Sequence, residues 1–148
     1  MIKIYTIGFT QKSAKEFFDT LHNNGIEIVI DTRINNISQL AGFAKGDDLE
    51  YFLDKIYGVK YAYRSDFAPT KELLKDYRDK IISWKEYIVI YNKLLDERGS
   101  YKNFLRDYVN YSKVCLLCSE ATAEKCHRRL LAEKINQVFL AETEVIHI

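Results

Sequence analysis

Residues 113–129 read K-V-C-L-L-C-S-E-A-T-A-E-K-C-H-R-R, and this stretch decides how the chain folds and where a site lies. The apolar run at residues 114–118 predicts a short buried strand. A polar turn follows, and an amphipathic helix is expected from about residue 122 to residue 138. The stretch contains all three cysteines of the chain. Open α/β sheets bind their ligands where a strand passes into a helix, so a candidate site is expected at this corner.

The rest of the chain alternates between strand and helix patterns. Strands are expected at residues 2–7, 26–30, 59–63, 114–118 and 144–148. Helices are expected at residues 14–23, 47–57, 70–80, 84–98, 100–110 and 122–138, and residues 34–46 are expected to form a loop. The alternation predicts a single α/β domain over residues 1–148, with a three-layer, mostly parallel five-stranded sheet and helices on both faces. Right-handed crossovers favour the strand order 3-2-1-4-5.

Composition narrows the class of protein. Hydrophobic residues make up 47% and charged residues 29% of the 148, which is typical of a globular protein. The net charge of +1 gives no overall basic footprint for nucleic acid, although a local basic patch would still allow that partner. No apolar run approaches the roughly 18 residues of a membrane span, so no membrane partner is expected. The N-terminal segment is too short and too strand-like for a signal peptide. Three clustered cysteines suit a reducing cytoplasm.

Three polar tripeptides end three of the expected strands. They are G-F-T at residues 8–10, D-T-R at 31–33 and C-S-E at 118–120. The carboxyl ends of parallel strands meet at one edge of the sheet, so these tripeptides are expected to converge. We expect the crevice between the first and fourth strands to be the site.

Arginines and hydroxyl or amide groups near this edge suggest anion binding. Arg33 and Arg128 are candidate ligand-binding residues because a guanidinium binds phosphate or carboxylate through two hydrogen bonds. Thr10 and Gly8 precede a helix N-terminus that favours phosphate. Two structural alternatives remain open: an internal ion pair between Asp31 and Arg33, and a salt bridge from Arg128 to an acidic residue of the preceding turn.

Candidate catalytic groups lie in the same segments. Glu120 and His127 are the acid–base candidates, with Asp31 and Cys118 as further catalytic candidates. Drawn as one helix from residue 122, the last helical segment has Leu131, Ile135 and Val138 on its buried stripe. On this helical wheel, His127 and Arg128 flank the buried stripe and are expected to face the crevice, whereas Cys126 lies off the stripe.

Cys118 and Cys126 have three interpretations: small buried apolar residues, thiolates, or metal ligands together with Cys115 and His127. The spacing is not a standard zinc pattern, and adjacent residues such as Cys126 and His127 can rarely both reach one ion. We therefore assign no residue to a metal and list Cys126 with the ligand-binding candidates. The eleven tyrosines are interpreted as packing residues rather than base-stacking ones.

The chain also resembles a known family. The segments I-Y-T-I-G-F-T (4–10), V-I-D-T-R (29–33), L-L-C-S-E-A-T-A-E-K-C-H-R-R-L (116–130) and V-I-H-I (145–148) are similar to the domain-of-unknown-function family 488. That family's motifs look like T-I-G-H-S, V-D-V-R, L-x-C-A-E and C-H-R. Phe9 and Thr10 stand where the commoner form has His and Ser. The matching positions are Gly8, Asp31, Arg33, Cys118, Glu120, Cys126, His127 and Arg128.

The leading hypothesis is a cytoplasmic enzyme, a hydrolase or transferase, that acts on a phosphate-bearing ligand such as a nucleotide or nucleic-acid fragment. The first alternative is a non-enzymatic module that binds an anion or nucleic acid. The second is a thiol-redox or metal-binding protein. The sequence assigns no cofactor and no oligomeric state.

Overall fold

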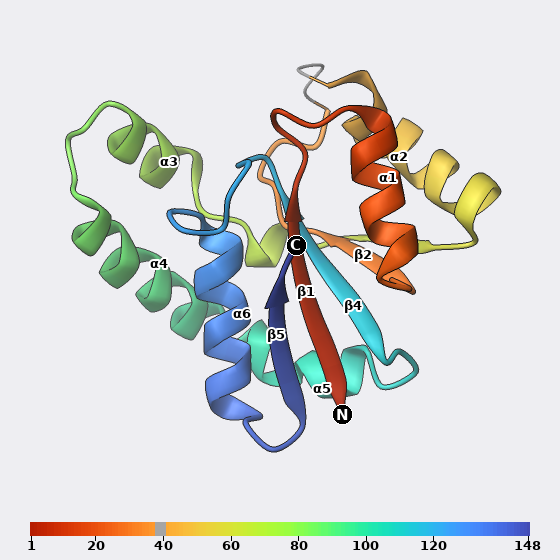
Figure 1. The fold of residues 1–148 in the computed structure, drawn as a ribbon. Coiled ribbons are helices and arrows are strands. Elements are labelled where there is room, and N and C mark those ends of the chain that lie inside the picture. The colour runs from red at the N-terminus through yellow and green to blue at the C-terminus, as the bar shows by residue number, and fades with distance from the viewer. Residues whose placement is uncertain (38–40) are drawn as a thin grey trace.

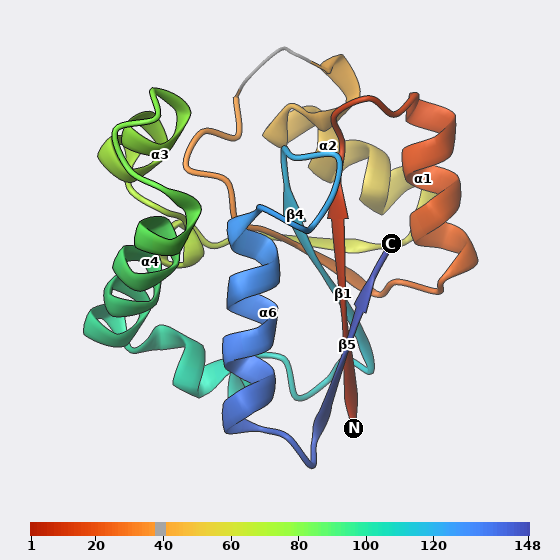
Figure 2. The ribbon, with the colours of Figure 1, turned by 60° about the vertical axis from the view of Figure 1, so that its left-hand side comes forward.

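The computed structural model describes residues 1–37 and 41–148, and these residues form a five-stranded parallel sheet with helices on both faces (Figures 1 and 2). The strands are β1 (Ile2–Gly8), β2 (Ile28–Asp31), β3 (Lys60–Tyr63), β4 (Lys113–Cys118) and β5 (Thr143–His147). Every neighbouring pair is parallel. The α/β class and the parallel sheet predicted from the sequence are confirmed. Of the predicted loop at 34–46, residues 38–40 lie outside the described residues.

The strand order is 3-2-4-1-5 and not 3-2-1-4-5. β4 lies between β2 and β1, so that Cys118 is paired with Gly8, and Leu117 with Asp31. Both β1 and β4 are almost wholly buried, and such runs read alike in sequence wherever they stand in the middle of a sheet. The connection from β1 to β2, through the helix that follows β1, passes over β4. The hydrophobic periodicity of the sequence does not show that a strand lies between the two. Cys118 therefore stands at the centre of the carboxyl edge.

One face of the sheet is covered by α1 (Ala14–Asn23), η1 (Gly42–Ala44), α2 (Gly46–Phe52) and the π-helical turn η2 (Leu53–Tyr57). The Oγ of Ser13 accepts the backbone N–H of Glu16 at 3.1 Å, which begins α1 as predicted. α2 begins at Gly46, with Lys45 rather than Asp47 in the capping position. This face packs mainly through Ile7, Phe17, Phe18, Leu21, Val29, Leu49, Leu53, Cys115 and Leu117.

The opposite face carries α3 (Lys71–Arg78), α4 (Trp84–Arg98), η4 (Ser100–Asn103), α5 (Phe104–Asp107) and α6 (His127–Val138). Figure 1 shows α3 and α4 as a pair beyond α6, on the side of the sheet away from α1. Thr70 caps α3, and Ser83 with Glu86 forms a capping box at the start of α4. This face packs mainly through Ile4, Ile30, Phe67, Tyr87, Tyr91, Leu95, Phe104, Leu116, Leu131 and Ile135.

The last helix begins later than its sequence pattern predicted. α6 starts at His127 and not near residue 122, because residues 119–126 cross the sheet edge as an irregular loop. Cys126 is extended, with φ −135° and ψ 142°, so the helical wheel does not apply to it. Leu131 and Ile135 are buried as expected, whereas Val138, in the last turn, is 50% exposed.

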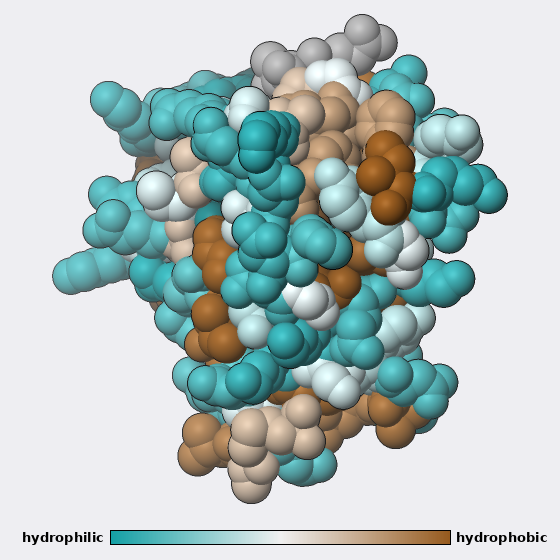
Figure 3. Space-filling view, turned by 45° about the vertical axis from the view of Figure 1, so that its right-hand side comes forward, coloured by the Kyte–Doolittle hydropathy of each residue, from teal (hydrophilic) through white to brown (hydrophobic). Residues whose placement is uncertain are grey.

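The outer surface is largely polar where it is drawn in space-filling form. Figure 3 shows hydrophilic side chains over most of that face, with apolar side chains in small separate patches. Among the described residues, no helix combines the length and the apolar character needed to cross a membrane.

Candidate functional site

A pocket of about 400 Å³ opens at the carboxyl edge of β2 and β4, on the face that carries α3, α4 and α6. Its size falls within the range of small-molecule sites. Figure 2 shows α3 and α4 beside the first turn of α6. The lining residues come from the loop after β2, from α3 and α4, and from the β4–α6 loop: Arg33, Ile34, Asn35, Leu74, Tyr77, Trp84, Tyr87, Cys118, Ser119, Glu120, Lys125, Cys126 and His127.

One wall of the pocket is aromatic. The Trp84 and Tyr87 rings stack with centroids 5.0 Å apart and planes 17° apart. Tyr77 lies 5.5 Å from Trp84 and 5.3 Å from Tyr87. The sequence interpretation treated the α4 rings as packing residues, and Tyr87 is indeed buried. Trp84 and Tyr87 nevertheless border the pocket. The only feature of the sequence that pointed to them was the helical spacing of the apolar residues of α4.

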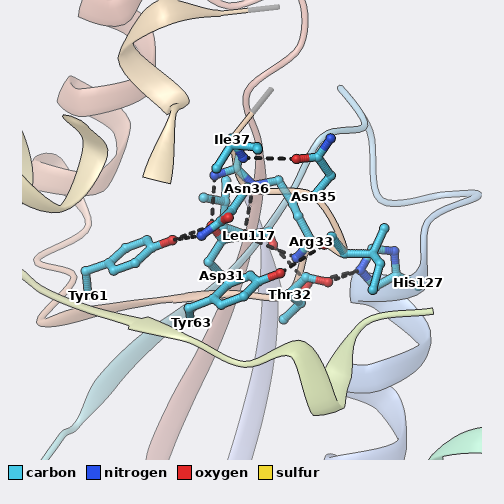
Figure 4. Close-up of polar contacts among 11 residues, drawn as sticks. Asp31, Thr32, Arg33, Asn35, Asn36, Ile37, Tyr61, Tyr63, Leu117 and His127 are labelled. Carbon is cyan, nitrogen blue, oxygen red and sulfur yellow. Dashed lines mark hydrogen bonds and ion pairs between the residues drawn. The ribbon is translucent and has the colours of Figure 1, made fainter. Parts of the chain in front are cut away.

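Asp31 and Arg33 form a buried ion pair beside the pocket (Figure 4). Arg33 Nε and Nη2 donate to the two carboxylate oxygens at 2.9 and 2.8 Å, and the Tyr61 hydroxyl donates to Asp31 Oδ2 at 2.6 Å. Burial alone would lower the pKa of Arg33, but Asp31 outweighs it and raises that pKa. Arg33 Nη1 is buried and has no hydrogen-bond partner within residues 1–37 and 41–148. The internal ion pair is therefore present, and the Nη1 amino group of Arg33 is left without a partner among these residues.

His127 is held by the loop after β2. Its Nε2 lies 3.0 Å from the Thr32 carbonyl oxygen and 3.1 Å from Thr32 Oγ1 (Figure 4). The Thr32 hydroxyl donates its own proton to the Leu117 carbonyl at 2.8 Å. Both Thr32 oxygens can then only accept from His127, so Nε2 carries the ring proton. Burial lowers the pKa of His127 to about 4, which makes the ring neutral near pH 7.

Arg128 lies beneath the pocket and is 1% exposed. Its Nη1 donates to Cys118 Sγ at 3.0 Å and also to the Glu120 carbonyl. Within the described residues, Arg128 forms no salt bridge with Glu124, the acidic residue of the preceding turn; instead the neighbouring Arg129 donates to the Glu124 carbonyl. The Arg128 guanidinium therefore joins the end of β4 to the first turn of α6.

The cysteines occupy two different environments, and all three are free thiols. Burial would raise the pKa of the Cys118 thiol, but a hydrogen bond with Cys126 and the charge of Arg128 lower it. Burial and the neighbouring Cys118 raise the pKa of Cys126. Cys115 points to the other face of the sheet, and burial raises its pKa. Cys118 is thus the thiol of this chain with a stabilised thiolate.

Gly8 and Thr10 support the site from outside the pocket. The backbone N–H of Thr10 donates to the Ser119 carbonyl at 3.0 Å, and its hydroxyl donates to the same oxygen. Gly8 lies against the Glu120 carbonyl, with no room for a side chain. These contacts fix the β4–α6 loop against the end of β1.

The predicted site residues therefore fall into three groups. Five of them line the pocket: Arg33, Cys118, Glu120, Cys126 and His127. Asp31 and Arg128 lie behind it, and Gly8 and Thr10 hold the loop from the β1 side. Cys126, which the helical wheel placed off the buried stripe, is in fact buried at 2% exposure and borders the pocket. The pocket lies between β2, β4 and the α3–α4 pair rather than in a crevice between β1 and β4.

The chain is thus an α/β protein with a ligand-sized pocket at the carboxyl edge of a parallel sheet. The family model described as "Domain of unknown function DUF488" matches residues 13–135, so the chain belongs to this family and the resemblance seen in the sequence is confirmed. The matched range includes every residue that lines the pocket. Comparisons with curated proteins and with solved structures gave no match.

Proposed function

We propose that this protein is an enzyme, a hydrolase or transferase, that acts on a small phosphate-bearing ligand with a planar ring, of which a nucleotide is the type. The observation that carries the proposal is the composition of the pocket. The rings of Tyr77, Trp84 and Tyr87 form one wall, and Arg33 and Lys125 also line the cavity. Aromatic faces bind planar rings by stacking, and cationic groups bind phosphate through charge-assisted hydrogen bonds.

The charges of the site favour an anion at one end of the pocket. Asp31 neutralises Arg33 but leaves its Nη1 without a partner in the described part of the chain. A buried donor of this kind gains a bond when a ligand oxygen reaches it. Lys125 is exposed at the pocket and adds a positive charge. Arg128 is already bonded to Cys118 and Glu120, so we assign phosphate binding to Arg33 and Lys125 first.

Proton transfer is best assigned to Glu120. Its side chain is exposed and lines the pocket, so it can reach both ligand and water. His127 is a weaker acid–base candidate because its Nε2–H is bonded to the Thr32 carbonyl and burial lowers its pKa to about 4. The buried carboxylate of Asp31 orients Arg33.

Three free thiols are consistent with action in the cytoplasm.

Ligand binding can be followed by the fluorescence of Trp84, the single tryptophan of the chain. We expect a nucleoside monophosphate to bind more tightly than either the nucleoside or inorganic phosphate, and its affinity to fall with added salt. Lys125→Ala should weaken the monophosphate about tenfold, since a charge-assisted bond contributes roughly 1.5–3 kcal/mol, and should leave the nucleoside unchanged. Lys102→Ala, an exposed lysine outside the pocket, is the matched control. Equal binding of nucleoside and monophosphate would refute the phosphate assignment.

Turnover separates an enzyme from a binding module. Water should attack the phosphorus of a bound nucleotide and release the nucleoside and inorganic phosphate, or cleave a phosphodiester bond of a short oligonucleotide into two shorter products; a transferase would use an added alcohol as acceptor in place of water. Glu120→Gln should slow the reaction without weakening ligand binding. Binding with no product in any reaction would identify the pocket as a non-enzymatic binding site.

A further inference from the structure

Cys118, Cys126 and His127 form a cluster on the pocket floor that the proposed reaction does not use. One ligand atom from each of the three residues lies within 4.8 Å of those of the other two. All three side chains are buried and all three line the pocket. In a tetrahedral zinc site with bonds of roughly 2.0–2.3 Å, neighbouring ligand atoms are roughly 3.5–3.8 Å apart. The cluster therefore needs side-chain shifts of only about 1 Å to hold one ion.

The adjacency of Cys126 and His127, which argued against a metal in the sequence, is overcome by the backbone. Cys126 is extended in the N-cap position and His127 is the first residue of α6. This change of conformation between the two residues turns both side chains to the same side, with Cys126 Sγ 4.0 Å from His127 Nδ1. A continuous helix would have separated them by about 100°.

The protonation of His127 also favours a metal at this cluster. Its Nε2–H donates to the Thr32 carbonyl at 3.0 Å, so Nδ1 carries the free lone pair, and Nδ1 is the atom on the cysteine side. Histidines that bind metals commonly donate their other ring N–H to a carbonyl or carboxylate, which fixes the tautomer and the ring plane. The Thr32 carbonyl serves that purpose here.

Three positive charges work against a cation at this place. Arg128 is the one in contact with the cluster, since its Nη1 lies 3.0 Å from Cys118 Sγ and 3.9 Å from Cys126 Sγ. Arg33 and Lys125 line the same pocket. Two thiolates balance a divalent ion, and the Arg128 guanidinium then acts as an N–H donor to metal-bound sulfur. Glu120, exposed at the same pocket, supplies a further negative charge. On binding, the Cys126 thiol releases its proton to solvent, as does any Cys118 still protonated.

We propose that Cys118 Sγ, Cys126 Sγ and His127 Nδ1 bind one borderline divalent cation, of which Zn²⁺ is the type. Two sulfurs and one imidazole suit zinc rather than magnesium or calcium. Three protein ligands leave a fourth position, and because all three ligands border the pocket, that position belongs to water or substrate. Sites of this kind are catalytic rather than structural. The metal site does not depend on the phosphate ligand proposed above.

Cobalt titration of the intact, metal-free native protein tests the site directly. We expect one Co²⁺ per chain, with a near-ultraviolet sulfur-to-cobalt charge-transfer band and the visible bands of tetrahedral cobalt. Zn²⁺ should displace the cobalt and abolish both sets of bands. Absence of the charge-transfer band in the folded native protein would overturn the proposal, whatever the variants do. Nucleotide binding measured with chelator present is a separate result, so the two proposals fail independently.

Variants assign the ligands. Cys118→Ser, Cys126→Ser and His127→Gln should each weaken Zn²⁺ binding by about 100-fold or more. Loss of a residue that only supports a metal ligand costs roughly 10–100-fold, and loss of a ligand itself should cost at least as much as the upper end of that range. Each cysteine variant should also reduce the charge-transfer intensity. Cys115→Ala and His147→Gln, which remove the same chemical groups elsewhere in the chain, should bind as the native protein does. Unchanged spectra in both cysteine variants, or equal binding by urea-unfolded protein, would show that the bound metal is not held by this cluster.

Discussion

Gly8, at the end of β1, lies directly against the carbonyl oxygen of Glu120 in the β4–α6 loop, and a Cβ added to Gly8 would overlap that oxygen. It would also lie 2.7 Å from Arg128 Nη1. The same Glu120 carbonyl accepts a hydrogen bond from Arg128, which in turn donates to Cys118. Glycine at this position therefore allows the whole pocket floor to sit against the sheet.

Replacing Gly8 with alanine should push this loop away from the sheet. We expect Gly8→Ala to lower the free energy of unfolding by about 2 kcal/mol or more, because the obstacle is backbone rather than a flexible side chain. Urea denaturation measures the change. Gly42→Ala is the matched control, since a Cβ there meets no atom of residues 1–37 and 41–148 within 4 Å. Equal stability of the two variants would contradict the contact.

Arg128 should be needed for folding as well as for the site. Arg128→Ala leaves the Glu120 carbonyl and the Cys118 sulfur without their donor and opens a cavity, so we expect a loss of about 3 kcal/mol in unfolding free energy. Thermal and urea denaturation measure it. Arg106→Ala, at an arginine with a 74% exposed side chain, should change stability by less than about 0.5 kcal/mol. A fully stable Arg128→Ala protein would show that the guanidinium is not structural.

The Cys118 thiol should react as a thiolate at lower pH than free cysteine. Its pKa is lowered by Cys126 and Arg128 against the effect of burial. The pH profile of iodoacetamide alkylation, measured with chelator and resolved by peptide mapping, should have its midpoint for Cys118 below the free-cysteine value of about 8.5. Cys126→Ala should move that midpoint upward. A midpoint above 8.5 in the native protein would refute the stabilised thiolate.

His127 should make the protein less stable in mild acid. The folded pKa of about 4 lies below the ordinary value of 6.5, so the unfolded chain binds a proton that the native state does not. The contribution of the neutral His127 ring to the free energy of unfolding is fully present above pH 6.5, declines as the pH falls toward 4 and is lost below pH 4. The free energy of unfolding differs by on the order of 3 kcal/mol between these two limits.

Urea denaturation of native protein and His127→Gln at a series of pH values tests this. The native protein should lose more stability than the variant between pH 6.5 and 4, and the difference isolates His127 from the carboxylates that titrate nearby. Parallel curves would mean that the imidazole is not held neutral.

The Asp31–Arg33 pair should be costly to break from one side. Asp31→Asn keeps the shape of the side chain but leaves the Arg33 charge buried without its counter-ion, and the expected loss is roughly 3–5 kcal/mol in unfolding free energy. Asp19→Asn, in the exposed pair with Lys15, should change stability by less than about 0.5 kcal/mol. Calorimetric melts of both variants decide between a structural and a peripheral role for Asp31.

Local signals in the amino-acid sequence are enough to predict the helices and strands and their approximate ends. Capping by Ser13 and Ser83, left-handed glycines at 58 and 99, and continuous apolar runs are local signals, because they depend on backbone conformation and burial within a few residues. Parallel strands share one carboxyl edge whatever their order. For that reason the sequence also brought Arg33, Cys118, Glu120 and His127 to the correct edge of the sheet.

The order of the strands, the contacts between side chains and the walls of the pocket depend on tertiary contacts. A run buried on both faces reads the same in either central position, so the places of β1 and β4 could not be told apart. The orientation of Cys126 depended on where α6 begins, and that was set by contacts of residues 119–126 with the end of β1. The aromatic wall around Trp84 belongs to α3 and α4, which are distant in sequence from the ends of β2 and β4 that form the rest of the pocket. The hydrophobic periodicity of a helix does not show which other elements the helix packs against.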